Sequence, residues 1–331
     1  MKTSRKLLMT LLLASAAGSA GAADKITIMV GGIEKQIYLP AKLAEQLGYL
    51  KETGLEVELL SEPAGVNAET EMLSGAAQGV VGFYDHTVDL QARGKMVESV
   101  VQFSQAPGEA ILVSKAAAKN LKSAADFKGK TLGVTGLGSS TNFLTQFLAV
   151  KAGVKNSDFT TLPVGSGSTF ITAMAQGKID AGMTTEPTIS RLVSSGAASI
   201  LIDLRTAKET QAALGGTYPA ACLYMPTAWV ASHKEQVQKL ANAFVKTLQY
   251  IHTHSAQEIT EKMPADYYAS GKQAYIDALA GSKMMFTADG VMPADGPATV
   301  LNVLNGFDKA VQGKAINLAN TFTTEFVKAA K

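Results

Sequence analysis

The segment TLGVTGLGSSTNFLTQFLAVKAG, residues 131–153, contains the pattern that decides the fold of this chain. Its first four residues are strand-like, a loop with two glycines follows, and residues 142–152 place apolar side chains at helical spacing. Gly153 then ends the helix, because glycine best tolerates the left-handed conformation at helix ends. A strand, a glycine loop and a helix in this order predict an α/β fold with a mostly parallel sheet.

The same arrangement occurs twice in the chain. Three strands alternate with two helices and glycine loops in residues 26–85, and the same order recurs in residues 131–186. Each copy ends at a carboxylate, Asp85 in the first and Glu186 in the second. Two copies with glycine stops in register predict two similar α/β lobes that face each other across a cleft.

Residues 1–22 have the features of a secretory signal peptide. Three basic residues come first, an apolar segment follows, and residues 20–22 form a small-x-small cleavage site. The apolar segment, residues 7–17, is shorter than the ~20 residues that a membrane span needs. No cysteine stands directly after the cleavage site, where a lipid would be attached. We therefore expect export to the periplasm through a cleaved signal peptide, without a lipid anchor.

Composition excludes several classes of protein. The full chain has a formal net charge of +2, but three of its 30 basic residues and none of its 28 acidic residues lie in the signal peptide. The mature chain, with 27 basic and 28 acidic residues, has a formal charge of −1. It has no basic stripe, so we expect no nucleic-acid partner. Cys222, the single cysteine, cannot form an internal disulfide and reads as a small core residue.

The remaining segments suggest how the lobes are connected. The apolar runs 110–114 and 221–225 bracket the second copy, and we expect them to form a two-strand hinge. This places the first lobe in residues 23–112 and 222–331 and the second in residues 113–221. The interval 119–130 reads as a polar helix and turn. Four helices are expected near the end of the chain, to complete the first lobe and brace the hinge: 234–254, 256–262, 272–280 and 298–311.

Candidate ligand contacts lie where strands end, because parallel α/β sheets bind ligands at the carboxyl ends of their strands. Gly138, Ser139, Ser140 and Thr141 stand between a strand and a helix. Backbone amides and the helix dipole at such a position attract an anion, although serine and threonine can also simply cap the helix. Ser168, in the second glycine loop, follows the same logic with less force.

Opposite these donors we expect further candidates from the other strand ends and loops. Each has a structural alternative: a carboxylate can brace a loop, Tyr38 can pack in the core, and Asn67 can cap a helix. Tyr218 is expected to close over the mouth of the cleft. The full set of these candidates is Gln36, Tyr38, Asn67, Asp85, His86, Glu186 and Tyr218.

The sequence argues against several more specific kinds of site. The glycine loop after residue 134 lacks the third glycine of a dinucleotide fingerprint, and neither a Gly-x-Ser-x-Gly elbow nor a phosphate-binding Gly-x-x-x-x-Gly-Lys loop occurs. His252 and His254 are two residues apart and face different sides of a helix, which argues against a zinc pair. No nucleophile, base and orienting group come together. We therefore expect no metal, no cofactor and no catalytic residue.

Taken together, several motifs resemble the exported solute-binding proteins of ABC importers, in the NMT1/THI5-like group that takes nitrate, sulfonates, taurine and thiamine precursors. The motifs are YLP at 38–40, LGYLKETGLEV at 47–57, FKGK at 127–130 with GV at 133–134, GSST at 138–141, GKIDA at 177–181 and EP at 186–187. The resemblance implies a type II periplasmic-binding fold, and ligand-facing positions at Gln36 to Tyr38, Asp85, Ser139 to Thr141 and Glu186. Sulfonate and nitrate binders of this group usually add cationic side chains, for which Lys35, Arg191 and Arg205 are the candidates here.

We therefore expect a monomeric periplasmic receptor that captures a small anionic or zwitterionic organic solute and delivers it to an ABC permease at the inner membrane. Sulfonate, nitrate, carboxylate and pyrimidine types are all open. One alternative is a pyrimidine-precursor synthase, because related folds host such enzymes; this would need a reactive histidine or cysteine in the cleft, where His86 is the candidate. A second alternative is a ligand-sensing subunit for a membrane receptor.

Overall fold

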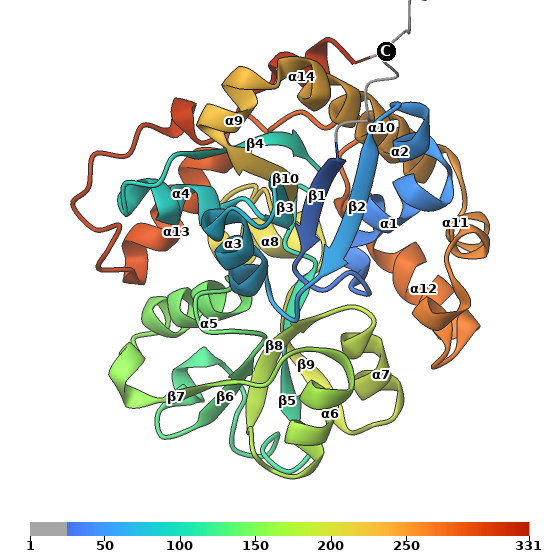
Figure 1. Cartoon of the computed structure of the whole chain (residues 1–331). Coiled ribbons are helices and arrows are strands. Elements are labelled where there is room, and N and C mark those ends of the chain that lie inside the picture. Colours follow the sequence, from blue (N-terminus) through green and yellow to red (C-terminus); the bar gives the residue numbers. More distant parts are fainter. Residues whose placement is uncertain (1–24, 331) are drawn as a thin grey trace, which may run out of the picture.

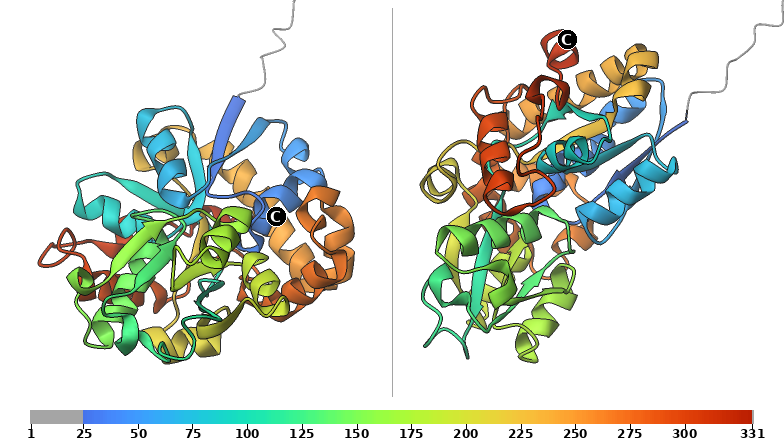
Figure 2. Two further views of the ribbon diagram at one scale, coloured as in Figure 1. Left: turned by 90° about the horizontal axis from the view of Figure 1, so that it is seen from below. Right: turned by 90° about the vertical axis from the view of Figure 1, so that its left-hand side faces the viewer.

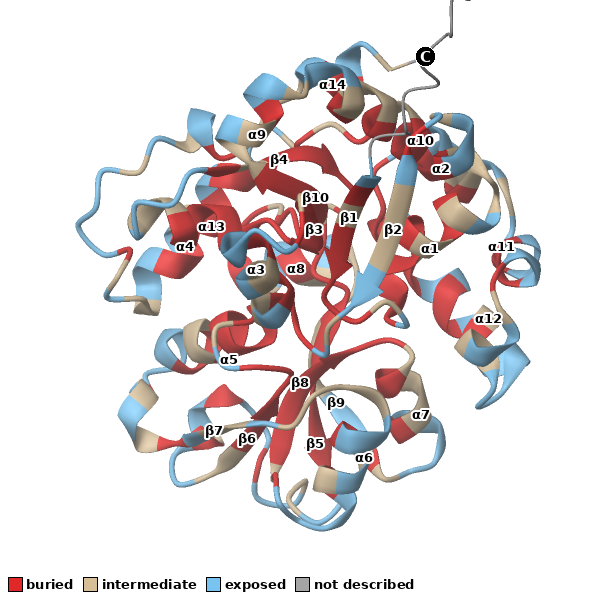
Figure 3. Cartoon of the chain, viewed as in Figure 1, coloured by how far each residue is buried: buried red, intermediate tan, exposed pale blue. Residues whose placement is uncertain are grey.

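Two five-stranded sheets organise the protein, one in each lobe (Figure 1). The computed structural model describes residues 25–330, so the predicted signal peptide lies outside the described residues. In both further views of Figure 2 the lobe drawn in green lies against the rest of the molecule along one boundary. Figure 3 shows that the central strands of both sheets are buried, whereas strands at the sheet edges and the outer faces of the helices are partly exposed.

The first sheet has the strand order β2-β1-β3-β10-β4. Strands β1, β2 and β3 are mutually parallel, and β10 pairs antiparallel with both β3 and β4. Only β10 therefore runs against the other four strands. The bounds are β1 (Lys25–Val30), β2 (Glu56–Ser61), β3 (Gly79–Phe83), β4 (Val97–Gln102) and β10 (Ala221–Pro226).

The second sheet repeats this topology in the order β7-β6-β8-β5-β9. Strands β6, β7 and β8 are parallel, and β5 lies antiparallel between β8 and β9. The bounds are β5 (Glu109–Ser114), β6 (Thr131–Val134), β7 (Thr160–Pro163), β8 (Ala181–Thr185) and β9 (Ala198–Leu204). The expected doubling is confirmed, since β1, β2 and β3 correspond to β6, β7 and β8.

The chain crosses between the lobes twice, and the strands that follow the crossings are β5 and β10. The chain leaves β4 in the first sheet and becomes β5 in the second; it leaves β9 in the second and returns, after one helix, as β10 in the first. The expected runs 110–114 and 221–225 are thus strands, one in each sheet, and the lobes are joined through the segments that precede them. Each lobe is completed by a strand that enters it directly from the other lobe.

Helices flank both sheets, and their bounds follow in chain order: η1 (Gln36–Tyr38), α1 (Leu39–Gln46), α2 (Tyr49–Glu52), α3 (Gly65–Ser74), α4 (Asp85–Ala92), η2 (Ala124–Phe127), α5 (Ser140–Lys151), η3 (Asn156–Asp158), α6 (Gly167–Ala175), α7 (Thr188–Ser194), α8 (Ala207–Leu214), α9 (Thr227–Ser232), α10 (Lys234–Thr253), α11 (Ala256–Lys262), η4 (Ala265–Tyr268), α12 (Lys272–Ser282), η5 (Lys283–Met285), α13 (Gly296–Phe307), η6 (Leu318–Asn320) and α14 (Glu325–Lys328). Within residues 25–330, none of them combines the length and apolar character of a membrane span.

Glycine stops end the helices where the sequence pattern places them. Gly75 closes α3 with φ of 88°, and Gly153 follows α5 with φ of 83°. Both angles lie in the left-handed region, which side chains with a Cβ adopt at a cost.

Two of the predicted helices differ from the structure. The interval 119–130 contains only the short turn η2 rather than a longer helix. Helix α13 spans 296–307 instead of 298–311, because Asp308 is already extended. Helix α13 packs against both α4 of the first lobe and α5 of the second. Helix α12 of the first lobe also contacts α7 of the second, so α12 and α13 both bridge the lobes.

Candidate ligand-binding site

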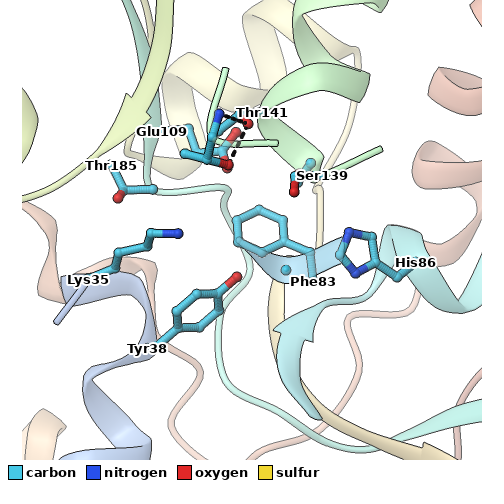
Figure 4. A pocket seen from close by; sticks show the side chains of 11 residues that line it. Lys35, Tyr38, Phe83, His86, Glu109, Ser139, Thr141 and Thr185 are labelled. Atoms are coloured by element: carbon cyan, nitrogen blue, oxygen red, sulfur yellow. Dashed lines mark hydrogen bonds between the residues drawn. The ribbon is translucent and has the colours of Figure 1, made fainter. Parts of the chain in front are cut away.

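A buried cavity lies between the lobes, at the carboxyl ends of the parallel strands (Figure 4). The side chains around it come from both lobes and are mostly polar. The lining consists of Lys35, Tyr38, Gly65, Phe83 and His86 from the first lobe and Glu109, Thr135, Ser139, Ser140, Thr141 and Thr185 from the second. The free volume is about 10 Å³, which is space for roughly one water molecule. The lobes are closed on each other, so a larger solute must enter when they separate.

Sheet register explains which strand residues reach the cavity. Phe83 and Thr185 are the last residues of β3 and β8, at equivalent positions of the two lobes. Glu109 opens the antiparallel strand β5 and pairs with Thr185. When a strand runs antiparallel to its neighbours, its first residue lies at the same sheet edge as their last residues. Glu109 is thereby brought to the edge of the sheet that lines the cavity.

The N-terminus of α5, where the sequence predicts donors for an anion, lies at the cavity. Gly138 turns the chain with φ of 88°, and its amide donates to Asn142 Oδ1 at 3.1 Å. Ser139 makes no side-chain capping bond; its Oγ instead accepts from Val66 N of the first lobe at 3.4 Å. Thr141 Oγ1 accepts from Thr135 N at 3.0 Å. Ser140 Oγ is buried without a hydrogen-bond partner in residues 25–330. The alternative that Ser139 only caps the helix is therefore wrong.

Lys35 is a buried cation at the cavity wall. Its amine donates to Gly31 O and Pro63 O and points toward the centre of the cavity in Figure 4. Burial lowers the pKa of Lys35 to about 8, against the opposing attraction of Glu34 and Glu109. An ammonium group has three hydrogens. Two of them are donated to these carbonyl groups, so one remains for a solute.

Glu109 is the acidic group of the cavity, and the sequence analysis missed it. It is 2% exposed, and its Oε2 has no hydrogen-bond partner anywhere in the described chain. Burial and, second, repulsion from Asp85 raise the pKa of Glu109 well above its usual value, although Lys35 opposes the shift. The sequence does contain a signal for this residue, because Glu109 is a charged residue directly before the apolar run 110–114.

Asp85 and His86 form a buried network behind the cavity. His86 lines the cavity, whereas Asp85 lies deeper and accepts from the Tyr218 hydroxyl at 2.8 Å through Oδ2. His86 Nε2 is 3.8 Å from Asp85 Oδ1, and His86 Nδ1 is 3.2 Å from the Tyr224 hydroxyl and 3.6 Å from Glu69 Oε2. The expectation that Tyr218 closes the mouth is wrong, because Tyr218 is fully buried and oriented by Asp85.

Gln36 and Glu186 are used mainly in structural contacts. Gln36 N donates to Glu186 O at 3.1 Å, and its Nε2 donates to Tyr275 O at 3.0 Å. The Glu186 carboxylate accepts from Arg205 Nη1 at 2.8 Å and from the Ser190 amide at 2.9 Å. Neither Gln36 nor Glu186 lines the cavity. Arg205, which also pairs with Asp203, is engaged within the second lobe.

Asn67 and Ser168 lie away from the cavity. Asn67 is exposed in the first turn of α3, whose N-cap is Ala64, so the expectation that Asn67 caps this helix is wrong. Ser168 is exposed and lines a surface groove of about 360 Å³ beside β7 and α6. Of the twelve predicted contacts, the structure brings these five to the cavity: Tyr38, His86, Ser139, Ser140 and Thr141.

The described residues contain no group of three or more histidine, cysteine or acidic side chains arranged to hold a metal ion. Cys222 is a fully buried residue of β10, and burial raises the pKa of its thiol. It does not line the cavity. The ionisable side chains that line it are Lys35, Tyr38, His86 and Glu109.

Sequence comparison identifies the family. The sequence model described as NMT1/THI5 like matches residues 38–258. The chain belongs to the NMT1/THI5-like family. It is similar to the 4-amino-5-hydroxymethyl-2-methylpyrimidine phosphate synthase THI13 of Saccharomyces cerevisiae, with 30% identity over 164 residues. The alignment covers 49% of this chain and 46% of the yeast protein, so it spans about half the length of that relative.

Proteins from several bacteria have solved structures with the same fold. A protein of Bordetella bronchiseptica RB50 superposes with a TM-score of 0.88 at 36% identity, over 92% of this chain and 96% of that one. The alkanesulfonate-binding protein SsuA of Xanthomonas axonopodis pv. citri, bound to MOPS, gives 0.72 at 18% identity, over 92% and 100%. The type II periplasmic-binding fold implied by the sequence is confirmed.

Proposed function

We propose that this NMT1/THI5-like protein is an exported receptor that captures a small organic solute between its lobes and delivers it to an ABC permease. The observation that carries the proposal is the cavity itself, lined by polar side chains from both lobes. Buried polar atoms without partners are uncommon in native proteins. Here the Ser140 hydroxyl and one Glu109 oxygen lack any within residues 25–330 and lie at the cavity, as expected of a solute site.

Closure of the lobes is the proposed binding step. Ser139 accepts from Val66, and Gln36 donates to the backbone of Glu186, so both contacts join opposite lobes. A solute that bonds to groups of both lobes stabilises the closed form over an open form, in which those groups are apart. The closed shape would then be what the permease recognises.

Location and partners follow from the same proposal. The sequence features of residues 1–22 favour export to the periplasm, and the solute-binding proteins of this fold favour a permease partner. The names of similar proteins include alkanesulfonate and nitrate as bound solutes and a pyrimidine phosphate as the product of a synthase, so these classes are the first to test. We propose that the receptor acts as a monomer and carries no metal or cofactor.

Native mass spectrometry and solution scattering test this function. The mature protein, purified without denaturation, should retain a small molecule, and return of that molecule to stripped protein should raise Tm and reduce the radius of gyration. Absence of a retained molecule, together with no change in Tm or compaction over a panel of sulfonates, carboxylates, nitrate and pyrimidines, would contradict it.

Similarity to the yeast synthase favours a second candidate, an enzyme of pyrimidine-precursor formation. His86 lies at the cavity and is the reactive group that such an enzyme would use. Mass spectrometry of incubations with the retained molecule separates the two functions. A receptor returns the molecule unchanged, whereas a synthase changes its mass.

A further inference from the structure

The charged groups at the cavity decide which solutes fit. The cavity is more acidic than the sequence suggests. Three carboxyl groups face this region: Glu109 at the wall, Asp85 behind it, and Glu69 against His86. Asp85 is fully buried, and its Oδ1 accepts no hydrogen bond from any described residue. Glu109 Oε2, which also lacks a partner, is the one of these two oxygens that lies at the cavity wall.

Cations for an anionic solute are few by comparison. Lys35 gives two of its three hydrogens to backbone carbonyl groups. Arg205 is held by Asp203 and Glu186, at 2.7 and 2.8 Å. Arg191 lies at a separate small cavity beside Tyr267 and not among the lining residues. Of the cationic side chains, Lys35 therefore leaves one ammonium hydrogen for negative charge, beside the N-terminus of α5. The Ser140 and Thr185 hydroxyls and His86 Nε2 also line the cavity and have no hydrogen-bond partner in the described chain.

A solute that is only an anion fits this balance poorly. It would place a negative charge beside Glu109 and near Asp85 in a buried cavity, where like charges repel more strongly than in water. A solute with N–H donors would instead satisfy the open Glu109 oxygen through charge-assisted hydrogen bonds.

Aromatic rings around the cavity favour the same chemistry. Tyr38 and Phe83 meet edge to face, with ring centroids 6.1 Å apart. In Figure 4 both rings lie between Lys35 and His86. Ring faces attract cationic groups, and the Lys35 amine already lies over the Tyr38 ring, 5.9 Å from its centroid.

Resting on the proposed receptor function, we infer that the solute carries a nitrogen donor, a protonated amine or an amidine-type N–H pair, seated against Glu109, and that Glu109 is the residue that selects it. A negative group elsewhere on the solute is permitted at Lys35 and the start of α5 and is not required. Inorganic anions and solutes that carry only a sulfonate or carboxylate are rejected.

Pairs of probe compounds that have nearly the same shape but opposite charge test the inference directly, because they separate the effect of charge from that of shape. Guanidinium and nitrate, acetamidinium and acetate, and benzamidinium and benzoate are nearly equal in shape and opposite in charge. Calorimetry and Tm shifts at millimolar concentration, on stripped and refolded mature protein, should show at least one cation binding about tenfold or more tightly than its anionic partner.

Glu109 variants assign the selectivity. Glu109→Gln should abolish the preference, with about a tenfold loss for the cation and a gain for the anion. Glu109→Asp should retain a reduced preference, and Lys35→Met should increase it. Glu235→Gln, at an exposed pair with Lys239, is the matched control and should change nothing. Circular dichroism and urea unfolding verify that each variant is folded; if Glu109→Gln is not, Glu109→Asp and Lys35→Met still decide.

Better binding of the anions, or binding by neither member of any pair, would overturn the inference. The retained molecule gives an independent decision. A retained solute without a nitrogen donor would overturn the inference while leaving the receptor function intact. Failure to detect any solute-dependent closure would overturn the receptor function itself.

Discussion

Glu109 links binding to stability. A carboxyl whose pKa is higher in the folded than in the unfolded chain binds more protons when folded, so its stabilising contribution is present at low pH. That contribution is lost as pH rises through the raised pKa. Because burial holds the pKa of Glu109 well above its usual value, ionisation of Glu109 destabilises the empty closed form. The same buried oxygen is available to a solute.

We predict that Glu109→Gln gains stability relative to the wild type as pH rises. The difference in free energy of unfolding should grow steadily between pH 4 and pH 8, because ionisation of the buried carboxyl is unfavourable only in the folded chain. Urea unfolding at several pH values measures it. Glu235→Gln, which changes an exposed carboxyl, should show a flat difference, and a flat difference for Glu109→Gln would refute the argument.

Arg205 and Glu186 show the structural use of a predicted ligand contact. The Glu186 carboxylate is almost fully buried, so removal of its partner leaves a buried charge with less compensation. We predict that Arg205→Met lowers the free energy of unfolding by about 2–3 kcal/mol. Lys234→Met breaks an exposed pair with Glu325 and should cost under about 1 kcal/mol. Equal losses in urea unfolding would argue against a structural role for Arg205.

Helix starts in this chain serve two different purposes. Ser255 caps α11, accepting from Glu258 N at 3.2 Å while its own amide donates to the Glu258 carboxylate at 2.8 Å. Ser139, at the start of α5, makes no such bond and instead contacts Val66 of the other lobe. Capping stabilises a helix against unfolding, whereas a contact between lobes stabilises one arrangement of the molecule.

Alanine substitutions should separate these purposes. We predict that Ser255→Ala costs about 1 kcal/mol of stability without changing solute affinity. Ser139→Ala should cost less than about 0.5 kcal/mol in urea unfolding and weaken binding of the retained solute. If Ser139→Ala destabilises the fold as much as Ser255→Ala and leaves affinity unchanged, Ser139 contributes to stability and not to solute binding.

Strand and helix positions were largely predictable because they depend on local patterns. The runs 110–114 and 221–225 are strands β5 and β10, extended by one residue each. The helix expected at 142–152 is α5, beginning at Ser140. The failure at 119–130 also has a local cause, since Gly129 takes φ of 73° and the interval offers only the four-residue turn η2.

Contacts between the lobes outside the cavity should set how readily the molecule opens. Helix α13 contacts α5 across the boundary, and the rings of Phe307 and Phe143 lie 5.9 Å apart. Aromatic pairs of this kind contribute about 0.5–1.5 kcal/mol beyond their burial. Closure therefore has a contribution that does not depend on the solute.

We predict that Phe307→Ala shifts the empty protein toward the open form. Solution scattering of stripped protein should give a larger radius of gyration than that of the wild type, and the solute should bind more weakly by up to about tenfold. Phe322→Ala is the control, because Phe322 contacts Tyr84 within one lobe. An equal expansion in both variants would indicate general loosening rather than opening of the lobes.

The sequence by itself determined the doubled α/β architecture, the glycine stops and the donor loop at Ser139 to Thr141, because apolar period, glycine placement and capping chemistry act over a few neighbouring residues. Only the tertiary structure decided that Glu109 and Lys35 face the cavity while Glu186 and Tyr218 are bonded elsewhere. Strand β5 lies antiparallel between β8 and β9, and this pairing alone carries Glu109 to the edge of the sheet that lines the cavity. The two crossings between the lobes join residues far apart in the chain, and no local pattern specifies such a pairing.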